Sequence, residues 1–277
     1  MADLTYIAKP VAQNYMGIGL FVVVLEFLSN KGCLSMKKIN EMSWIEFDKK
    51  RKETNIVIIP TGAIEVYGPH LPLGTDTIVA EEIARRVAEK VDVLVGPTIE
   101  VGDSAALNVF PGTLTIQPEN FKGYLYDICM SLINWGFKNF LFINTHLGNV
   151  PIINQICERL QKEQGVVCSQ IDWWRFVQPH CEGITQYSGI MAHGHAAETG
   201  TSVMLYLRKD LVDTTKLEAV TPKQEDKFPE IIKYPALNEI TDSGVIGDPT
   251  VASEEKGKKI VEKSINRIIE YINSKFK

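Results

Sequence analysis

The chain of 277 residues has few cysteines, no hydrophobic run long enough for a membrane helix, and no excess of basic residues. Its five cysteines show no Cys-x-x-Cys spacing, which argues against a disulfide framework and predicts a reducing, cytoplasmic location. The apolar run at residues 18–28 is shorter than the ~20 residues that span a bilayer, and Glu26 interrupts it. The net charge of −5 argues against nucleic acid or an anionic membrane as a partner.

The first 35 residues form a poor signal peptide, because the stretch before the apolar run is long and weakly charged. Met36 and the polar residues after it resemble a chain start. We therefore predict that residues 1–35 are an extension outside the core, and that residues 36–277 form a single domain. The alternative is an ordinary N-terminal strand or helix that docks on the core. Residues 212–250 are rich in Pro, Lys and Asp, which predicts a surface excursion or an oligomer contact.

From Asn55 onward, short β-branched runs alternate with segments of helical periodicity. Expected strands cover residues 56–59, 92–95, 140–144 and 166–171. Expected helices cover residues 77–91, 118–135, 151–163 and 198–208, and a last helix begins near 253. This alternation predicts βαβ units and an α/β fold, a three-layer α/β/α sandwich around a mostly parallel sheet.

The unusual polar residues follow the expected strands, where open α/β sheets bind their ligands. They are Glu65 and Asp76 after the first strand, Ser104 and Asn108 after the second, His146 and Asn149 after the third, and His193, His195 and Glu198 in a later loop. Glu65, His70 and Asp76 lie on one short Gly/Pro-rich loop after the first strand, and two carboxylates and a histidine there are costly to desolvate without a partner. A divalent metal ion is the partner that these ligand types favour.

Each residue also has an ordinary structural interpretation. Asp76 could cap the following helix, Glu65 could be a solvated loop carboxylate, and His146 could be a hydrogen-bonded structural histidine. His195 and Glu198, spaced i and i+3, share a face if a helix starts there, which favours a metal ligand beside a general acid or base. An exposed polar loop is the alternative. Trp173 and Trp174 could line a small-substrate pocket or belong to the core.

Several motifs in order resemble those of the creatininase (creatinine amidohydrolase) family, from about Met36 to the C-terminus. They are Pro60-Thr-Gly-Ala-Ile-Glu65 leading to Gly-Pro-His70-Leu-Pro-Leu-Gly-Thr-Asp76, Phe110-Pro-Gly-Thr113, Asn144-Thr-His-Leu-Gly-Asn149, His195-Ala-Ala-Glu198 with Thr201-Ser202, and Gly244-Val-Ile-Gly-Asp-Pro249. The resemblance implies a creatininase-like three-layer fold, a homo-oligomer that is often a hexamer, and a centre of one or two divalent ions (Zn, Mn or Fe). By this resemblance the metal ligands are Glu65, Asp76, His146 and Glu198.

The remaining site residues follow from the resemblance and from their places in the loops. His195 matches a proton-transfer histidine, and His70 is the second catalytic candidate. The expected substrate contacts are Tyr67, Ser104, Asn108, Asn149 and Trp174. Tyr67 stands where the family usually has a histidine that binds a second metal, Asn108 replaces another histidine, and Gly148 stands where creatininase has a glutamate. These departures argue against an authentic two-metal creatininase.

The expected function is a metal-dependent hydrolase that opens a small cyclic substrate, such as a creatinine-like amide, with metal-activated water. One alternative is a carbon–carbon hydrolase acting on a cyclic diketone of inositol catabolism, 3-dehydro-scyllo-inosose. An alternative of another class is a non-catalytic binding or assembly protein on a decayed enzyme fold. Retention of Glu65, Asp76, His146, His195 and Glu198 argues against this last one.

Overall fold

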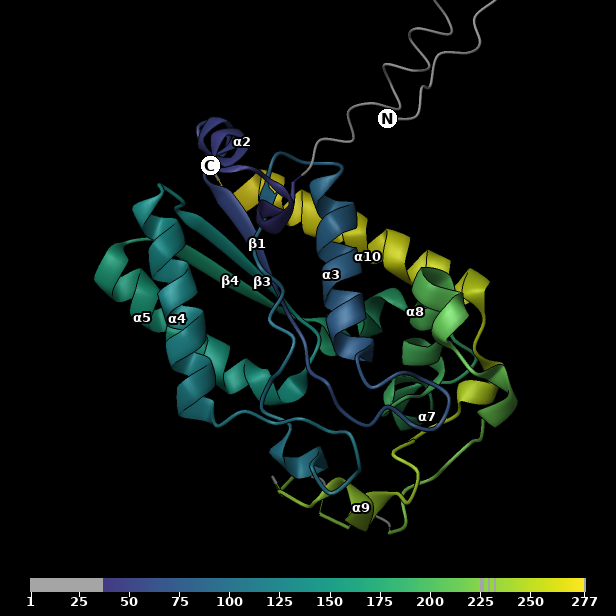
Figure 1. The fold of residues 1–277 in the computed structure, drawn as a ribbon. Coiled ribbons are helices and arrows are strands. Elements are labelled where there is room, and N and C mark those ends of the chain that lie inside the picture. The colour runs from purple at the N-terminus through teal and green to yellow at the C-terminus, as the bar shows by residue number, and fades with distance from the viewer. Residues whose placement is uncertain (1–36, 225–226, 229, 232, 277) are drawn as a thin grey trace, which may run out of the picture. The chain divides into compact units, whose positions relative to one another are not determined.

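A computed structural model describes residues 37–224, 227, 228, 230, 231 and 233–276, so the predicted extension at residues 1–35 lies outside the described part (Figure 1). The strands are β1 Ile56–Thr61, β2 Leu94–Val95, β3 Asn139–Asn144 and β4 Val167–Asp172. The longer helices are α2 Trp44–Lys50, α3 Thr75–Ala88, α4 Pro118–Asn134, α5 Val150–Gln164, α8 Glu198–Arg208 and α10 Glu254–Lys275. Short helices include α6 Trp173–Phe176, α7 Gly189–His193 and α9 Leu237–Ile240.

The four strands form one parallel sheet in the order β2-β1-β3-β4. In the central pair, Ile58 lies opposite Leu141 and Thr61 opposite Asn144, so β1 and β3 end at the same level. The predicted parallel sheet and each of its expected strands are confirmed, although β2 is shorter than expected. Because β1 and β3 lie side by side, the loops that follow them meet at one edge of the sheet.

The two faces of the sheet bury alternating side chains in two separate cores. Ile58, Leu141 and Ile143 pack with α3, α8 and α10 on one face. The opposite face directs its side chains toward α4 and α5. The predicted three-layer α/β/α sandwich is therefore confirmed, with α4 and α5 on one side and α3 and α10 on the other (Figure 1).

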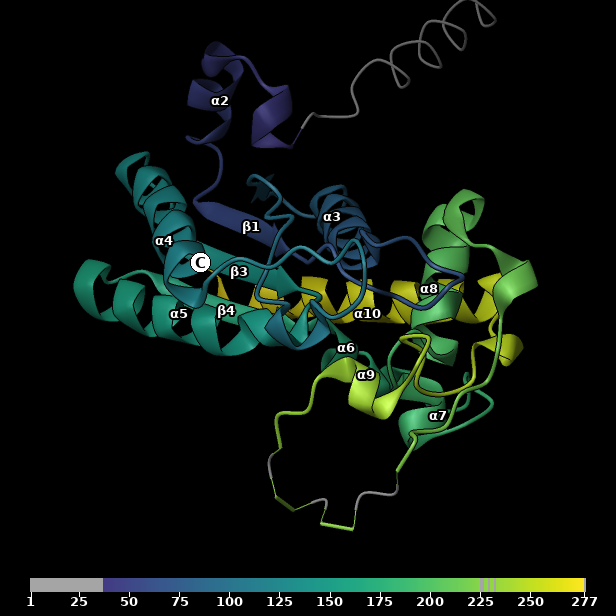
Figure 2. The same cartoon turned by 60° about the horizontal axis from the view of Figure 1, so that its bottom comes forward.

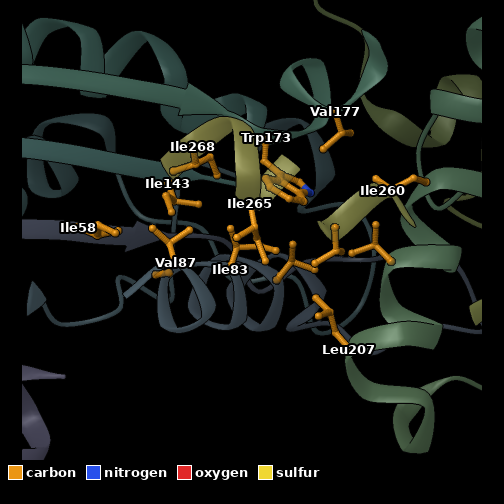
Figure 3. Close-up of a cluster of buried hydrophobic side chains, with 14 of the residues drawn as sticks. Ile58, Ile83, Val87, Ile143, Trp173, Val177, Leu207, Ile260, Ile265 and Ile268 are labelled. Carbon is orange, nitrogen blue, oxygen red and sulfur yellow. The ribbon is translucent and has the colours of Figure 1, made fainter. Parts of the chain in front are cut away.

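Helix α10 is the longest helix of the first core and shows why its sequence is helical. The Ser253 hydroxyl caps it by accepting a hydrogen bond from the Lys256 amide. Apolar residues recur at helical spacing, so that Ile260, Ile265 and Ile268 point into the core (Figure 3). Burying one such side chain stabilises the fold by roughly 1.5–3 kcal/mol.

Helix α3 begins at Thr75, two residues before its expected start, and its N-cap position is Gly74. Asp76 therefore lies inside the first turn and is not the cap, which leaves its carboxylate for other contacts. The loop before the helix is closed by a hydrogen bond from the Glu65 amide to the Leu73 carbonyl, 2.8 Å. Figure 2 shows α6 and α8 near the carboxyl ends of the strands, where this loop lies. Within the described ranges, no helix is long and apolar enough to cross a membrane.

Candidate metal centre

Three of the predicted metal ligands meet at the carboxyl ends of β1 and β3. Glu65, Asp76 and His146 each offer a ligand atom, and these atoms all lie within 4.8 Å of one another. All three side chains are buried, with exposed fractions of 2%, 1% and 4%. A buried group of two carboxylates and one imidazole matches the oxygen and nitrogen donors that divalent metals bind.

His146 is oriented so that one ring nitrogen faces both carboxylates. Its Nε2 lies 2.7 Å from the main-chain carbonyl oxygen of Asp103, which can only accept, so Nε2 carries the proton. Nδ1 lies 3.0 Å from Glu65 Oε2 and 3.4 Å from Asp76 Oδ2. A metal-ligating histidine is typically held in this way by a carbonyl on its second nitrogen. The lone pair of neutral His146 therefore points to the position that an ion would take.

The electrostatics of the cluster favour a cation. Burial raises the pKa of both carboxyl groups, but His146 and His195 reverse this for Glu65, whose pKa falls well below its usual value. Burial dominates at Asp76 and raises its pKa to about 6. Burial lowers the pKa of His146, yet Glu65 and Asp76 outweigh it and hold that pKa well above its usual value. A proton on Nδ1 thus takes the place that a metal ion would take.

His195 approaches the cluster from the opposite side of Glu65. Its Nδ1 lies 2.5 Å from the Gly244 carbonyl, which fixes the proton on Nδ1. Its Nε2 lies 3.6 Å from Glu65 Oε1, is buried, and has no hydrogen-bond partner among the described residues. An unpaired buried imidazole nitrogen is costly. A substrate, a water molecule or an ion in the site would satisfy it.

His70, the second predicted catalytic residue, is not part of the cluster. Its Nε2 lies 2.9 Å from the Thr201 hydroxyl, which in turn donates to the Ala196 carbonyl at 3.2 Å. Ala196 adopts a left-handed backbone with φ of 54°, a conformation that costs a non-glycine residue roughly 1–2 kcal/mol. His70 thus supports the strained turn that carries His195. Burial lowers the pKa of His70 to about 4, so this histidine is neutral near neutral pH.

Glu198, the fourth predicted ligand, makes other contacts and does not belong to the three-residue cluster. Its Oε1 accepts from the Gln186 amide at 2.7 Å and from Lys256 Nζ at 2.5 Å, and its Oε2 accepts from the Tyr187 amide at 3.1 Å. The carboxylate is fully buried. It joins the start of α8 to the start of α10 and to the loop before α7.

Two predicted substrate contacts, Ser104 and Asn149, instead make hydrogen bonds with Glu65 and with the neighbouring loops. The Ser104 hydroxyl donates to Glu65 Oε2 at 2.7 Å and is fully buried. The Asn149 side-chain Oδ1 accepts from the main-chain amide of Asp103 at 3.0 Å, and its Nδ2 donates to the main-chain carbonyl of Gly62 at 2.9 Å. Ser104 therefore orients the Glu65 carboxylate, and Asn149 ties together the loops around it.

Tyr67 and Trp174 form the aromatic walls of a small pocket beside the cluster, of about 230 Å³. The indole Nε1 donates to Asp76 Oδ1 at 3.1 Å, so this wall reaches the cluster. Asn108, in contrast, is exposed at the end of the 3-10 helix Ala105–Leu107. The lining residues are Tyr67, Leu147, Trp174, His193, Gly194, His195, Ala196, Thr199 and Gly200.

Two contributors to the site could not be read from residue types. The main-chain carbonyls of Asp103 and Gly244 set the tautomers of the two histidines, and a carbonyl group leaves no residue-specific signal. The Gly244 motif is the one indirect signal, because a glycine there has a φ of 78°. His193, one of the unusual polar residues of the later loop but not among the predicted substrate contacts, lines the pocket with its Nδ1 2.9 Å from the Thr199 hydroxyl.

Comparison with known proteins identifies the family of the chain. The family model described as "Creatininase: Creatinine amidohydrolase" matches residues 40–272. The chain belongs to the creatininase family. Creatinine amidohydrolase from Pseudomonas putida is 28% identical over 258 residues, which cover 86% of this chain and 96% of that protein. Mycofactocin precursor peptide peptidase from Mycolicibacterium smegmatis is 28% identical, and the match covers 76% of this chain and 81% of that protein.

A more distant member, 3-dehydro-scyllo-inosose hydrolase from Thermotoga maritima, is 25% identical, with 83% of this chain and 78% of that protein covered. Two solved creatininase structures show the same fold. "Creatininase Mn" matches with a TM-score of 0.77, and a mutant creatininase of Zn-Zn type with 0.78. Each is 24% identical to this chain, and each match covers 87% of this chain and 99% of the solved chain. These creatininase-family relatives are hydrolases, and the chain is an enzyme of that class.

Proposed function

We propose that this creatininase-family enzyme is a metal-dependent hydrolase that opens a small cyclic substrate, with a creatinine-like cyclic amide as the first candidate. The observation that carries the proposal is the buried Glu65, Asp76 and His146 cluster, whose Nδ1 lone pair and carboxylates converge within 4.8 Å. Two family neighbours are described as a manganese form and a Zn-Zn form, which supports Zn or Mn as the metal, with Fe as a further candidate. A bound divalent ion would polarise the substrate carbonyl and lower the pKa of water.

The protein's own residues divide the remaining work. Glu65, Asp76 and His146 hold the ion, and Ser104 fixes the Glu65 carboxylate. His195 is placed to move the proton, because its Nδ1–H is committed to the Gly244 carbonyl and only Nε2 is free to accept or donate. The leaving nitrogen of an amide needs such a proton before it can depart.

The pocket supports a small, flat substrate. Its volume of about 230 Å³ is below the ~300–1,000 Å³ that drug-sized ligands occupy. The rings of Tyr67 and Trp174 lie with centroids 6.3 Å apart, and the imidazole of His195 lies 4.5 Å from the Tyr67 ring. A planar ring can contact such aromatic faces while its carbonyl faces the cluster.

A second candidate is carbon–carbon cleavage of a cyclic diketone. Two observations favour it: the similarity to the inosose hydrolase, and Gly148 in place of a creatininase glutamate. The leaving group would then be a carbanion stabilised as an enolate. His195 would protonate this carbon, whereas in amide hydrolysis it would protonate the leaving nitrogen. The pocket offers His193 and Thr199 as partners for substrate hydroxyl groups.

The test is turnover by protein stripped of metal with a chelator and reloaded with Zn²⁺, Mn²⁺ or Fe²⁺. Creatinine, dihydrouracil and 3-dehydro-scyllo-inosose are supplied separately, and the ring-opened products are quantified. We expect one of these substrates to be opened only by reloaded protein, and Glu65→Gln to abolish that turnover. Glu119→Gln, an exposed carboxylate in the first turn of α4, is the matched control and should stay active. Full turnover without metal, or by Glu65→Gln, would refute the proposal.

A further inference from the structure

Asp76 decides how many ions the centre can hold. Two-metal hydrolytic sites keep their ions ~3.5–4 Å apart and need carboxylates that present one oxygen to each ion. In this chain Asp76 Oδ2 faces His146 at 3.4 Å, on the side of the first ion. A second ion would need the other oxygen, Oδ1.

That second oxygen already accepts a hydrogen bond from a packed aromatic side chain. Trp174 Nε1 donates to Asp76 Oδ1 at 3.1 Å, and an indole nitrogen can only donate. The Tyr67 ring lies beside Trp174, with ring centroids 6.3 Å apart, and it is buried with 4% of its surface exposed. The positive end of the indole N–H faces Asp76, so a cation on this side would be repelled and would have to displace two packed aromatic rings.

Position 148 cannot supply a ligand for a second ion. Gly148 follows His146 closely, but a Cβ built on it would lie 2.0 Å from the Asp103 carbonyl oxygen and 2.7 Å from His146 Nε2. A longer side chain at position 148 would therefore require movement of the main chain.

Charge balance leads to the same result. One divalent ion neutralises the two carboxylates of the cluster, Glu65 and Asp76. A second would leave two uncompensated positive charges in a buried site, which is expensive. The next buried carboxylate in sequence, Glu198, is committed to Lys256 at 2.5 Å.

We propose that this enzyme has a one-ion centre, in which Tyr67 and Trp174 close the face of Asp76 where a second ion would bind. The inference rests on the proposed function, because it assumes that Glu65, Asp76 and His146 hold a metal. It distinguishes this chain from a two-metal arrangement such as the Zn-Zn form of creatininase. In this centre a single ion and His195 share the chemistry.

The test counts ions without measuring turnover. Chelator-treated protein receives two equivalents of Mn²⁺, bound metal is measured by elemental analysis after desalting, and the electron paramagnetic resonance spectrum is recorded. We expect one bound Mn²⁺ per chain with the six-line signal of an isolated ion, and one equivalent free. Two bound ions with a spin-coupled spectrum would overturn the one-ion centre and leave the proposed function standing. No bound ion would overturn both.

Variants then test the assigned residues. Tyr67→His combined with Trp174→Phe removes the indole donor from Asp76 and supplies an imidazole, so we expect a second Mn²⁺ and a spin-coupled spectrum. Tyr67→Phe, which keeps the ring and supplies no ligand, is the matched control and should bind one ion. Circular dichroism confirms that each variant is folded. If the folded double variant still binds one ion, Tyr67 and Trp174 are not what excludes the second.

Discussion

The contact between Glu198 and Lys256 allows a sharp test of what Glu198 does. The Glu198→Gln substitution removes the charge and leaves Lys256 Nζ with the Val251 carbonyl, 2.7 Å away, as its remaining partner. Breaking a buried ion pair typically costs ~3–5 kcal/mol. Because 22% of the Lys256 side chain is exposed, the lower end applies, and we expect a loss of about 3 kcal/mol in the free energy of unfolding.

For a domain of this size, a loss of about 3 kcal/mol lowers the melting temperature by roughly 6–12 °C, which differential scanning calorimetry resolves. Mn²⁺ affinity, measured by isothermal titration calorimetry, should stay unchanged within error, because Glu198 lies outside the cluster. Glu255→Gln is the matched control, since it breaks an exposed pair with Lys259 on the same helix and should cost less than ~1 kcal/mol.

The double variant Glu198→Gln with Lys256→Met completes the cycle. Because the two residues contact each other, its loss should be smaller than the sum of the single losses. The opposite pattern, with unchanged melting temperature and Mn²⁺ affinity weakened more than ~10-fold, would refute this reasoning and restore Glu198 as a ligand.

Three further predictions concern single residues. His146→Ala should abolish Mn²⁺ binding by calorimetry while the protein stays folded, and retained affinity would contradict its role as a ligand. The pKa of His70 is lowered to about 4, so neutral His70 contributes about 3 kcal/mol to the free energy of unfolding above pH ~6.5, and this contribution is lost as the pH falls toward 4. His70→Gln should therefore flatten this part of a urea-unfolding pH profile. An unchanged profile would count against this assignment. Ile268→Ala in α10 should cost ~2–5 kcal/mol in urea unfolding without altering Mn²⁺ affinity, and a loss below ~1 kcal/mol would show that the site is loosely packed.

The parallel sheet could be predicted from the sequence, and so could the meeting of Glu65, Asp76 and His146 at its edge. Strand runs such as Ile56–Thr61 are buried on both faces, so their periodicity and length identify them. Parallel strands end at one edge, which brings Glu65 and His146 together although 81 positions separate them in the numbering. That they bind a metal remains a proposal.

The direction of a side chain was harder to predict. Glu198 sits at the expected helix start, but its direction is set by Lys256, 58 residues later, and by two loop amides. Asn149 and His70 are polar residues at the predicted site, yet Asn149 pairs with main-chain groups and His70 Nε2 pairs with a threonine hydroxyl. Such long-range pairing is a tertiary property that local spacing does not encode.

The use of main-chain carbonyls to orient both histidines has a consequence for mutational tolerance. Asp103 can lose its side chain and still present its carbonyl to His146, so Asp103→Ala should preserve the His146 tautomer. Gly244 cannot be exchanged so freely, because its φ is 78° and a Cβ would lie 2.6 Å from Val66 Cγ2. Across natural variants of this enzyme, we expect side-chain identity to drift at position 103 and glycine to persist at position 244.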